Sequence, residues 1–356
     1  MHIPDGYLSP ESCGALGAAM VPVWATAGRR VRKVVKSRYV PLVAIGAAYS
    51  FLVMMFNLPI PDGTTAHAIG GVLIAVVLGP WAAVIAVSIA LLIQALFFGD
   101  GGVLAYGANA FNMAFVMPIA GYGVYRALTR NVALTSRRRP FAAGLGAYIG
   151  LNAAALCAAI ELGLQPALFH SANGTPLYAP FHLAQTIPAM ALAHLTVAGL
   201  VEVALTAGAI RYLQRANLPL LRLNHAAAPD AEAEVGPPAR IGRRWVFVGL
   251  GSLLALVPLG LLAPGNAFGE DAPGDLDLAK YHLNAVPNGL RHYAGFWHNA
   301  LFDGYGFGND PHPAIGYLVS AFAGIAAIAV VILVGVGIAR RVRRRAHHHA
   351  LERIAA

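Results

Sequence analysis

The first two residues of the chain carry nitrogen atoms that can chelate a metal ion. The opening Met1-His2-Ile3-Pro4-Asp5 has no basic residue and no apolar run, so it does not read as a signal peptide. Methionine is normally trimmed only ahead of small residues, so Met1 is expected to stay in front of His2. The Met1 α-amine, the His2 amide nitrogen and the His2 imidazole then lie in one plane once the amide loses its proton. Such a set suits Ni(II) or Cu(II), which prefer square-planar nitrogen, and leaves one corner open.

His67 is the candidate for the open corner. It ends a Pro/Gly-rich loop that runs from Leu58 and separates two apolar segments. A histidine at position 2, or alone in a loop, is more often an ordinary surface residue. The metal hypothesis therefore depends on whether both histidines lie on the same side of a membrane.

Three polar side chains within apolar segments are further candidates: Gln94, Asn109 and Asn112. Polar residues are costly in a membrane and tend to face the inside of a helix bundle. These three either hydrogen-bond a metal-bound imidazole or simply hold helices together, and the sequence leaves both roles open.

Composition places the chain in a membrane. Of its 356 residues, 58% are hydrophobic and only 12% are charged, whereas a soluble domain carries about 25% charged residues. We therefore predict an all-α polytopic membrane protein. Its net charge of +9 would suggest nucleic-acid binding in a soluble protein, so the location of the charges has to decide between the two explanations.

The apolar segments predict about nine membrane-spanning helices, because one span needs about 20 residues. Seven are expected within residues 1–213, from the apolar segments 11–28, 39–57, 68–98, 104–128, 140–168 and 181–213. The segment 68–98 is too long for one span and is expected to form two helices with a turn at Gly79-Pro80, so 104–128 is the fifth expected helix and 181–213 the seventh. A linker at 214–243 follows. Two further spans, 245–262 and 314–338, flank a long polar segment in a second domain at 244–342, and a basic tail occupies 343–356.

The basic residues test this layout. Of the 25 Lys and Arg residues, all but Lys280 and Arg291 fall in segments that are cytoplasmic if the N-terminus is outside. The net charge thus reflects topology, and no nucleic-acid partner is expected. The same layout puts the C-terminus in the cytoplasm and places Met1, the His67 loop and the Asp100 loop together on the outer face.

The chain has no motif of an enzyme that works on its own. It lacks the phosphate-binding GxxxxGK[ST] pattern of an ATPase and the HExxH pattern of a zinc protease. A metalloenzyme also needs an open coordination position and an acid or base beside the metal. The sequence places no carboxylate beside the four-nitrogen square, so we expect no catalytic residues and no organic cofactor.

The opening MHIPDGYLSP and the loop PDGTTAHAIGG around His67 resemble the substrate-capture components of nickel and cobalt energy-coupling-factor transporters, the CbiM/NikM family. The resemblance covers residues 1–213. It implies that the N-terminus folds into an outer pocket, where the Met1 amine, the His2 amide and imidazole and His67 hold the metal. It also implies separate ATP-binding cassette ATPase subunits and a transmembrane coupling (T/Q) protein as partners, in a bacterial or archaeal cytoplasmic membrane.

The C-terminal part resembles the small two-span companion component of these transporters, which carries a PDGLE-type domain. The residues that carry this resemblance are 286–290 and 304–308, although this chain has PNGLR where the motif has PDGLE. The long external loop of this part is acidic. We hypothesise that it attracts cations or gates the pocket through Glu270, Asp271, Asp275 and Asp277.

The sequence therefore predicts the capture subunit of a nickel uptake transporter, with Ni(II) as the transported substrate. A planar four-nitrogen site suits Ni(II) better than Co(II), but a cobalt uptake subunit that supplies cobalamin synthesis is the nearest alternative. A membrane metal sensor is the alternative from a different functional class.

Overall fold

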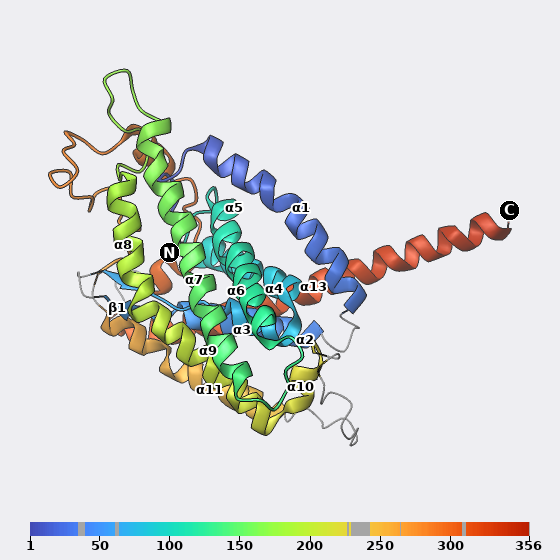
Figure 1. Ribbon diagram of the computed structural model, residues 1–356. Coiled ribbons are helices and arrows are strands. Elements are labelled where there is room, and N and C mark those ends of the chain that lie inside the picture. The colour runs from blue at the N-terminus through green and yellow to red at the C-terminus, as the bar shows by residue number, and fades with distance from the viewer. Residues whose placement is uncertain are drawn as a thin grey trace.

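The computed structural model describes residues 1–34, 40–60, 64–225, 228, 243–263, 265–307 and 311–355. Almost every regular element in these ranges is a helix, which confirms the all-α polytopic class (Figure 1). Four described segments are long and apolar enough to cross a membrane: α4 (Pro80–Phe98), α7 (Arg138–Leu168), the pair α8 (Leu183–Leu195) and α9 (Val197–Ala216), and the first part of α13 (Pro313–Ala355). The total of nine crossings stays a prediction.

The first helix, α1 (Pro10–Val34), starts where the sequence supplies a helix cap. The Ser9 hydroxyl accepts a hydrogen bond from the Ser12 amide at 3.1 Å, and Pro10 occupies the first helical position, where no amide hydrogen is needed. α1 continues past the predicted end at residue 28 into the basic run. α2 (Val40–Met54) follows and is buried along most of its length.

The third and fourth helices separate at Gly79-Pro80, as predicted. α3 (Gly71–Leu78) has only 8 residues, about 12 Å of helix, which is too short to cross a bilayer. Before it, two-residue strands β1 (Leu58–Pro59) and β2 (Thr65–Ala66) form a small antiparallel hairpin, pairing Leu58 with Ala66 and Pro59 with Thr65. His67 lies in the non-helical stretch between this hairpin and α3, and residues 61–63 of the predicted loop lie outside the described ranges.

The predicted fifth helix is a run of three helical pieces: α5 (Tyr106–Asn109), the π-helical η2 (Ala110–Val116) and α6 (Met117–Thr129). The π-helical turns come directly before Pro118. A proline ring clashes with the carbonyl four residues earlier in an α-helix, and the wider π turn relieves that clash. Of the candidate polar residues, Asn109 is the last residue of α5 and Asn112 lies within η2.

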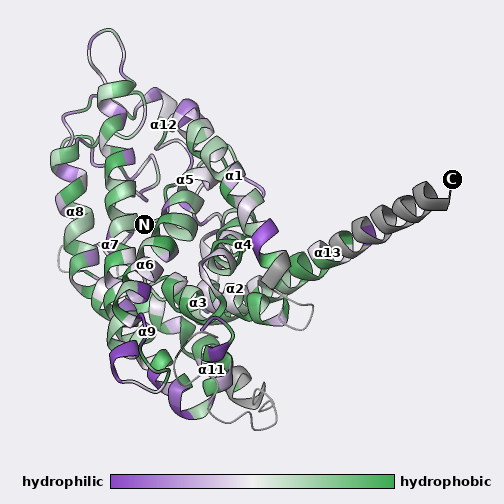
Figure 2. Cartoon of the chain, turned by 45° about the vertical axis from the view of Figure 1, so that its right-hand side comes forward, coloured by the Kyte–Doolittle hydropathy of each residue, from purple (hydrophilic) through white to green (hydrophobic). Residues whose placement is uncertain are grey.

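The predicted seventh helix is broken in the structure. α8 ends and α9 begins at Thr196, whose φ and ψ of −103° and −105° fit no helix. α7 packs closely on α6, and glycine at position 146 allows this approach. A Cβ added at Gly146 would lie only 2.4 Å from the Gly121 carbonyl oxygen. Apolar residues run along these helices, and hydrophilic residues gather near their ends (Figure 2).

The C-terminal part packs onto the first part. It contains α11 (Arg243–Leu256), η3 (Val257–Leu262), α12 (Asn288–Tyr293), η4 (Asp303–Tyr305) and α13, and both α11 and α13 contact α2. Buried residues of both parts belong to one apolar core.

Two predicted boundaries of the C-terminal half differ from the structure. α13 is one continuous helix through Ala355, so the basic tail predicted at 343–356 is mostly its last part. The predicted linker contains the end of α9 and the short α10 (Leu218–Arg222), while residues 226, 227 and 229–242 lie outside the described ranges.

Candidate metal centre

The N-terminal segment is buried inside the bundle. Met1 is 1% exposed and His2 is 2% exposed, and Figure 1 places the N-terminus among the helices. The Asp5 carboxylate accepts hydrogen bonds from the backbone amides of Val103 and Ala105, at 3.1 and 3.0 Å, just ahead of α5. Burial raises the pKa of Asp5, and these amide donors act in the opposite direction. The opening residues are thus held by specific bonds.

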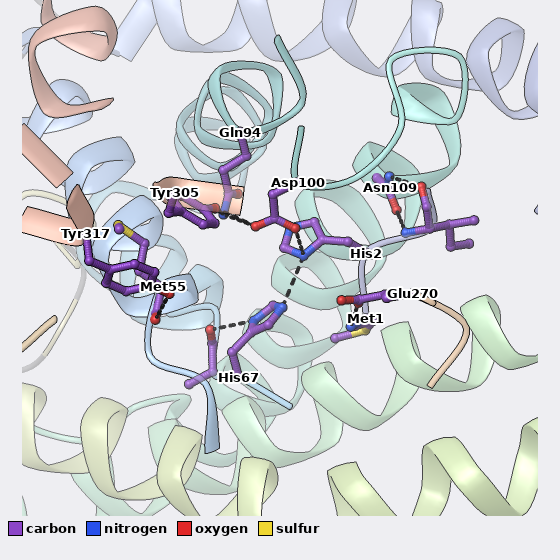
Figure 3. Close-up of polar contacts among 12 residues, drawn as sticks. Met1, His2, Met55, His67, Gln94, Asp100, Asn109, Glu270, Tyr305 and Tyr317 are labelled. Atoms are coloured by element: carbon purple, nitrogen blue, oxygen red, sulfur yellow. Dashed lines mark hydrogen bonds and ion pairs between the residues drawn. The ribbon is translucent and has the colours of Figure 1, made fainter. Parts of the chain in front are cut away.

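Asn109 fixes the segment one residue after His2. Its side-chain oxygen accepts the Ile3 amide at 2.8 Å, and its side-chain nitrogen donates to the Ile3 carbonyl at 3.0 Å (Figure 3). The Ile3 carbonyl also accepts the Gly102 amide at 2.9 Å. Asn109 therefore positions the main chain next to His2 and forms no hydrogen bond with the imidazole of His2 or His67.

The two candidate histidines face each other. His2 Nδ1 lies 3.2 Å from His67 Nε2, and the ring centroids are 4.9 Å apart. The other ring nitrogen of His67, Nδ1, is 3.1 Å from the Ala68 carbonyl, which as acceptor places the proton on Nδ1 and leaves a lone pair on Nε2. Burial lowers the pKa of His67 well below its usual value, and the nearby Met1 ammonium lowers it further. His67 is thus held neutral, the form that binds metals.

Two carboxylates stand at the ligand atoms, which corrects the expectation that none lies beside the square. The Met1 amine donates to Glu270 Oε1 at 2.8 Å, and His2 Nδ1 lies 3.1 Å from Asp100 Oδ1 (Figure 3). Glu270 belongs to the acidic external loop singled out in the sequence. Asp100 lies in the loop after α4, which the topology had placed on the same face as His67.

Gln94 reaches the centre through Asp100. Its side-chain nitrogen donates to Asp100 Oδ2 at 3.1 Å and lies 2.8 Å from the Tyr305 hydroxyl, which itself donates to Asp100. Tyr305 comes from η4 in the C-terminal part, so that part contacts Met1 directly through Glu270 and reaches His2 through Asp100. The sequence offered only the GYGFG motif as a signal for Tyr305.

Asn112 lies in a different cluster. Its side-chain nitrogen donates to Glu161 Oε2 at 2.8 Å, and no hydrogen bond joins it to Met1, His2 or His67. Of the three polar candidates, the structure brings Asn109 and Gln94 to the centre through the Ile3 backbone and Asp100, and leaves Asn112 outside these contacts.

Glu202 supports the stretch that carries His67. This buried carboxylate on α9 accepts the amide of Ile69 at 2.7 Å and that of Gly70 at 3.1 Å, directly before α3. Buried backbone amides outside a helix need such partners, because no helical carbonyl accepts from them. Glu202 lies within an apolar stretch of the sequence, but its partner could not be identified without the fold.

A cavity of about 500 Å³ adjoins the centre. It is lined by His2, His67, Asp100 and Glu270, together with residues of the external loop of the C-terminal part. Among the described residues, no three His, Cys, Asp or Glu side chains form a group able to hold a metal ion.

Comparison with known proteins shows what kind of protein the chain is similar to. Residues 2–220 match the CbiM family, described as the cobalt uptake substrate-specific transmembrane region. The chain is 47% identical over 356 residues to the fused nickel transport protein NikMN of Rhodobacter capsulatus, covering 97% of this chain and 99% of that one. It is 47% identical to the probable fused nickel transport protein LarMN of Lactiplantibacillus plantarum, covering 91% and 94%. A solved truncated transition metal transporter is 57% identical, with a TM-score of 0.56 over 60% of this chain and 98% of that one.

Proposed function

The chain belongs to the CbiM family of metal transport proteins, and we propose that it is the metal-capture subunit of an ATP-driven nickel uptake transporter. It is a multi-pass membrane protein with metal ions as substrates. The relatives named as fused nickel transport proteins span both halves of the chain, which supports a natural fusion of the capture component with its two-span companion. ATPase subunits and a transmembrane coupling protein of the cytoplasmic membrane are the partners that this function requires.

The contact between His2 and His67 is the observation that carries the proposal. In a chelate built from the Met1 amine and the His2 amide, Nδ1 is the imidazole atom that closes the next ring. Nδ1 is also the His2 atom that faces His67, at 3.2 Å from Nε2. Neighbouring corners of a square with metal–nitrogen bonds of about 2.0 Å are about 2.8 Å apart. Two ligand atoms of the proposed site are therefore close to their required spacing.

Loading then replaces carboxylate contacts with metal contacts. Ni(II) enters the cavity from outside, and the Met1 amine leaves Glu270 to coordinate the metal. His2 Nδ1 faces two acceptors, Asp100 Oδ1 and the lone pair of His67 Nε2, so in the metal-free protein it carries a proton. That proton moves to His2 Nε2 as Nδ1 binds the ion. The two carboxylates remain close enough to balance the charge of the bound ion. ATP hydrolysis in the partner subunits would then break the square and release the metal inward.

The decisive experiment compares Ni(II) titrations of the purified wild-type protein and of a variant with one alanine inserted between Met1 and His2. The insertion keeps every side chain but breaks the chelate ring, so binding should fall at least about 100-fold, and His67→Ala should act similarly. His170→Ala, in an exposed loop, is the matched control and should bind as wild type. An insertion variant with wild-type affinity would refute the N-terminal chelate.

Cobalt is the second candidate substrate, because the description of the matching family names cobalt uptake. Competition between Ni(II) and Co(II) for the purified protein separates the two, and a planar four-nitrogen site should favour Ni(II).

A membrane metal sensor, the alternative from a different functional class, would bind metal without transporting it. Uptake that requires an intact nucleotide-binding lysine in the partner ATPase, while metal binding does not, would establish transport.

A further inference from the structure

A second cavity, of about 420 Å³, lies away from the metal centre between α2, α3, α9 and α11. α2 lines it with Leu42, Gly46 and Tyr49, and α9 with Leu205, Ala209 and Tyr212. Residues three or four positions apart lie on one face of a helix, so each helix offers a stripe parallel to its axis. The α9 stripe continues to Ala216, which gives the slot a length of about 16 Å.

Almost all of this slot is apolar, but two of its polar atoms lack partners. The hydroxyl oxygen of Tyr49 and the side-chain oxygen of Asn217 are both buried without a hydrogen bond. Buried polar groups are nearly always paired in folded proteins. Asn217 lies at the junction of α9 and α10, at one end of the slot, and its oxygen can only accept a hydrogen bond.

Basic residues flank the same end. Arg211 and Arg215 lie on the last turns of α9, next to the lining residues Tyr212 and Ala216, and the Arg215 side chain is exposed. Arg222 follows on α10. A cluster of arginines beside helices of a membrane protein attracts anionic lipid headgroups.

We propose that this slot binds an anionic phospholipid of the phosphatidylglycerol class. An acyl chain lies along the apolar stripes of α2, α3 and α9. The headgroup phosphate sits by Arg215, and a headgroup hydroxyl donates to the free Asn217 oxygen. A long apolar slot with cations and an unpaired acceptor at one end matches the shape and polarity of such a lipid.

The far end of the slot touches the support of the metal centre. A Cβ added at Gly70 would lie 2.2 Å from the Tyr49 ring, so the ring lies directly against the Gly70 backbone. The Gly70 amide is bound by Glu202, and His67 lies three residues earlier. A bound acyl chain therefore supports Tyr49 from below and restricts the His67 stretch. This consequence, unlike lipid binding itself, rests on the proposed function.

The first test uses metal-free, delipidated full-length protein in a neutral detergent. Added dioleoyl-phosphatidylglycerol should raise the thermal unfolding midpoint by about 5 °C, and the same amount of dioleoyl-phosphatidylcholine should raise it much less. Ala209→Trp fills the slot and should abolish the difference, while Ala204→Trp, at an exposed position of the same helix, should keep it. Arg215→Gln should reduce the difference without filling the slot.

Native mass spectrometry of the same samples should find phosphatidylglycerol retained by wild type and Ala204→Trp and lost from Ala209→Trp. Equal stabilisation by both lipids, or retention in Ala209→Trp, would overturn the proposal. The proposal would also be overturned if an added coupling protein, and not phosphatidylglycerol, raised the thermal midpoint of wild type and failed to raise that of Ala209→Trp.

The second test asks whether lipid reaches the metal centre. The Ni(II) affinity of wild type should rise severalfold with phosphatidylglycerol, and that of Ala209→Trp should not change. If no variant binds Ni(II) but the lipid still stabilises the metal-free protein, the proposed function fails and the lipid site stands. If Ni(II) binds equally with and without lipid, the coupling between the two sites is refuted.

Discussion

Asn109 holds the main chain directly after the proposed nickel ligands Met1 and His2. It holds both polar groups of Ile3 and has no recorded hydrogen bond to His2 or His67. Residues that orient metal ligands from behind typically change affinity by about 10- to 100-fold when they are removed. We therefore expect Asn109→Ala to weaken Ni(II) binding by that factor while the fold persists, as measured by isothermal titration calorimetry and circular dichroism.

Asn112→Ala is the matched control, because it removes the same side chain three residues further along the same helical run. Asn112 binds Glu161, so its loss should change Ni(II) affinity by less than about threefold. Equal losses of affinity in both variants would mean that packing of the helical run α5–η2–α6, and not the hydrogen bonds from Asn109 to Ile3, determines the Ni(II) affinity.

Coordination chemistry also sets the number of protons released. The Met1 ammonium and the His2 amide must each lose a proton to bind Ni(II), whereas the lowered pKa of His67 keeps that ring neutral beforehand. At neutral pH we expect about two protons released per ion, and an affinity that rises about 100-fold per pH unit. Calorimetry in buffers of different ionisation enthalpy measures this number. Release of no protons would exclude coordination by the amide.

At the scale of elements, the short helix α3 depends on Glu202. Its Oε2 accepts the amides of both Ile69 and Gly70, and its Oε1 accepts the Gly70 amide as well. Glutamine puts an NH2 group, which can only donate, in place of one of these oxygens. Two buried donors that face each other cost about 1–3 kcal/mol, so Glu202→Gln should lower the thermal midpoint and weaken Ni(II) binding. Glu161→Gln serves as the control, because its remaining oxygen still accepts from Asn112. A neutral Glu202→Gln would show that the stretch is held by packing alone.

Some elements were predictable from sequence because their causes are local. The excess length of the segment 68–98 and its Gly79-Pro80 pair gave the turn between α3 and α4. The break at Thr196 was not predictable, since the hydrophobic pattern runs through it without interruption. The two-residue strands β1 and β2 are too short to leave any periodicity, and the π-helical run appears in the sequence only as a proline.

The same distinction applies to the site. Topology alone placed His2, His67 and the Asp100 loop on one face, because it follows from where the basic residues lie. It could not pair Asp100 with His2, or Glu202 with Gly70, because those contacts join residues far apart in the chain. The sequence also could not tell the role of Asn109 from that of Asn112. The two residues differ in the neighbour that each side chain meets, Ile3 for Asn109 and Glu161 for Asn112.

At the scale of the whole molecule, the C-terminal part covers the proposed metal centre of the first part. Glu270 binds the Met1 amine, the Asp271 carbonyl accepts the Tyr7 hydroxyl at 2.8 Å, and Tyr305 reaches Asp100. The two parts that the sequence separates into domains thus share one polar network. This arrangement supports a gating role for the acidic loop, since the amine has to leave Glu270 before it can bind the metal.

That role predicts how accessible the N-terminus becomes when the loop loses its charge. Glu270→Gln removes the ion pair but keeps a hydrogen-bond acceptor, so the N-terminal segment should open more often. An amine-selective reagent at fixed pH, followed by peptide mass spectrometry, should label Met1 several times faster than in wild type. In Asp271→Asn the rate should stay unchanged, because Asp271 binds the segment only through its backbone carbonyl. Equal acceleration in both variants would mean that the overall negative charge of the loop, and not the Glu270 contact, keeps the N-terminal segment closed. A second measurement is nickel uptake at low external metal by the variant that carries both Glu270→Gln and Asp271→Asn. Unchanged uptake by that variant would argue against any gating by the loop.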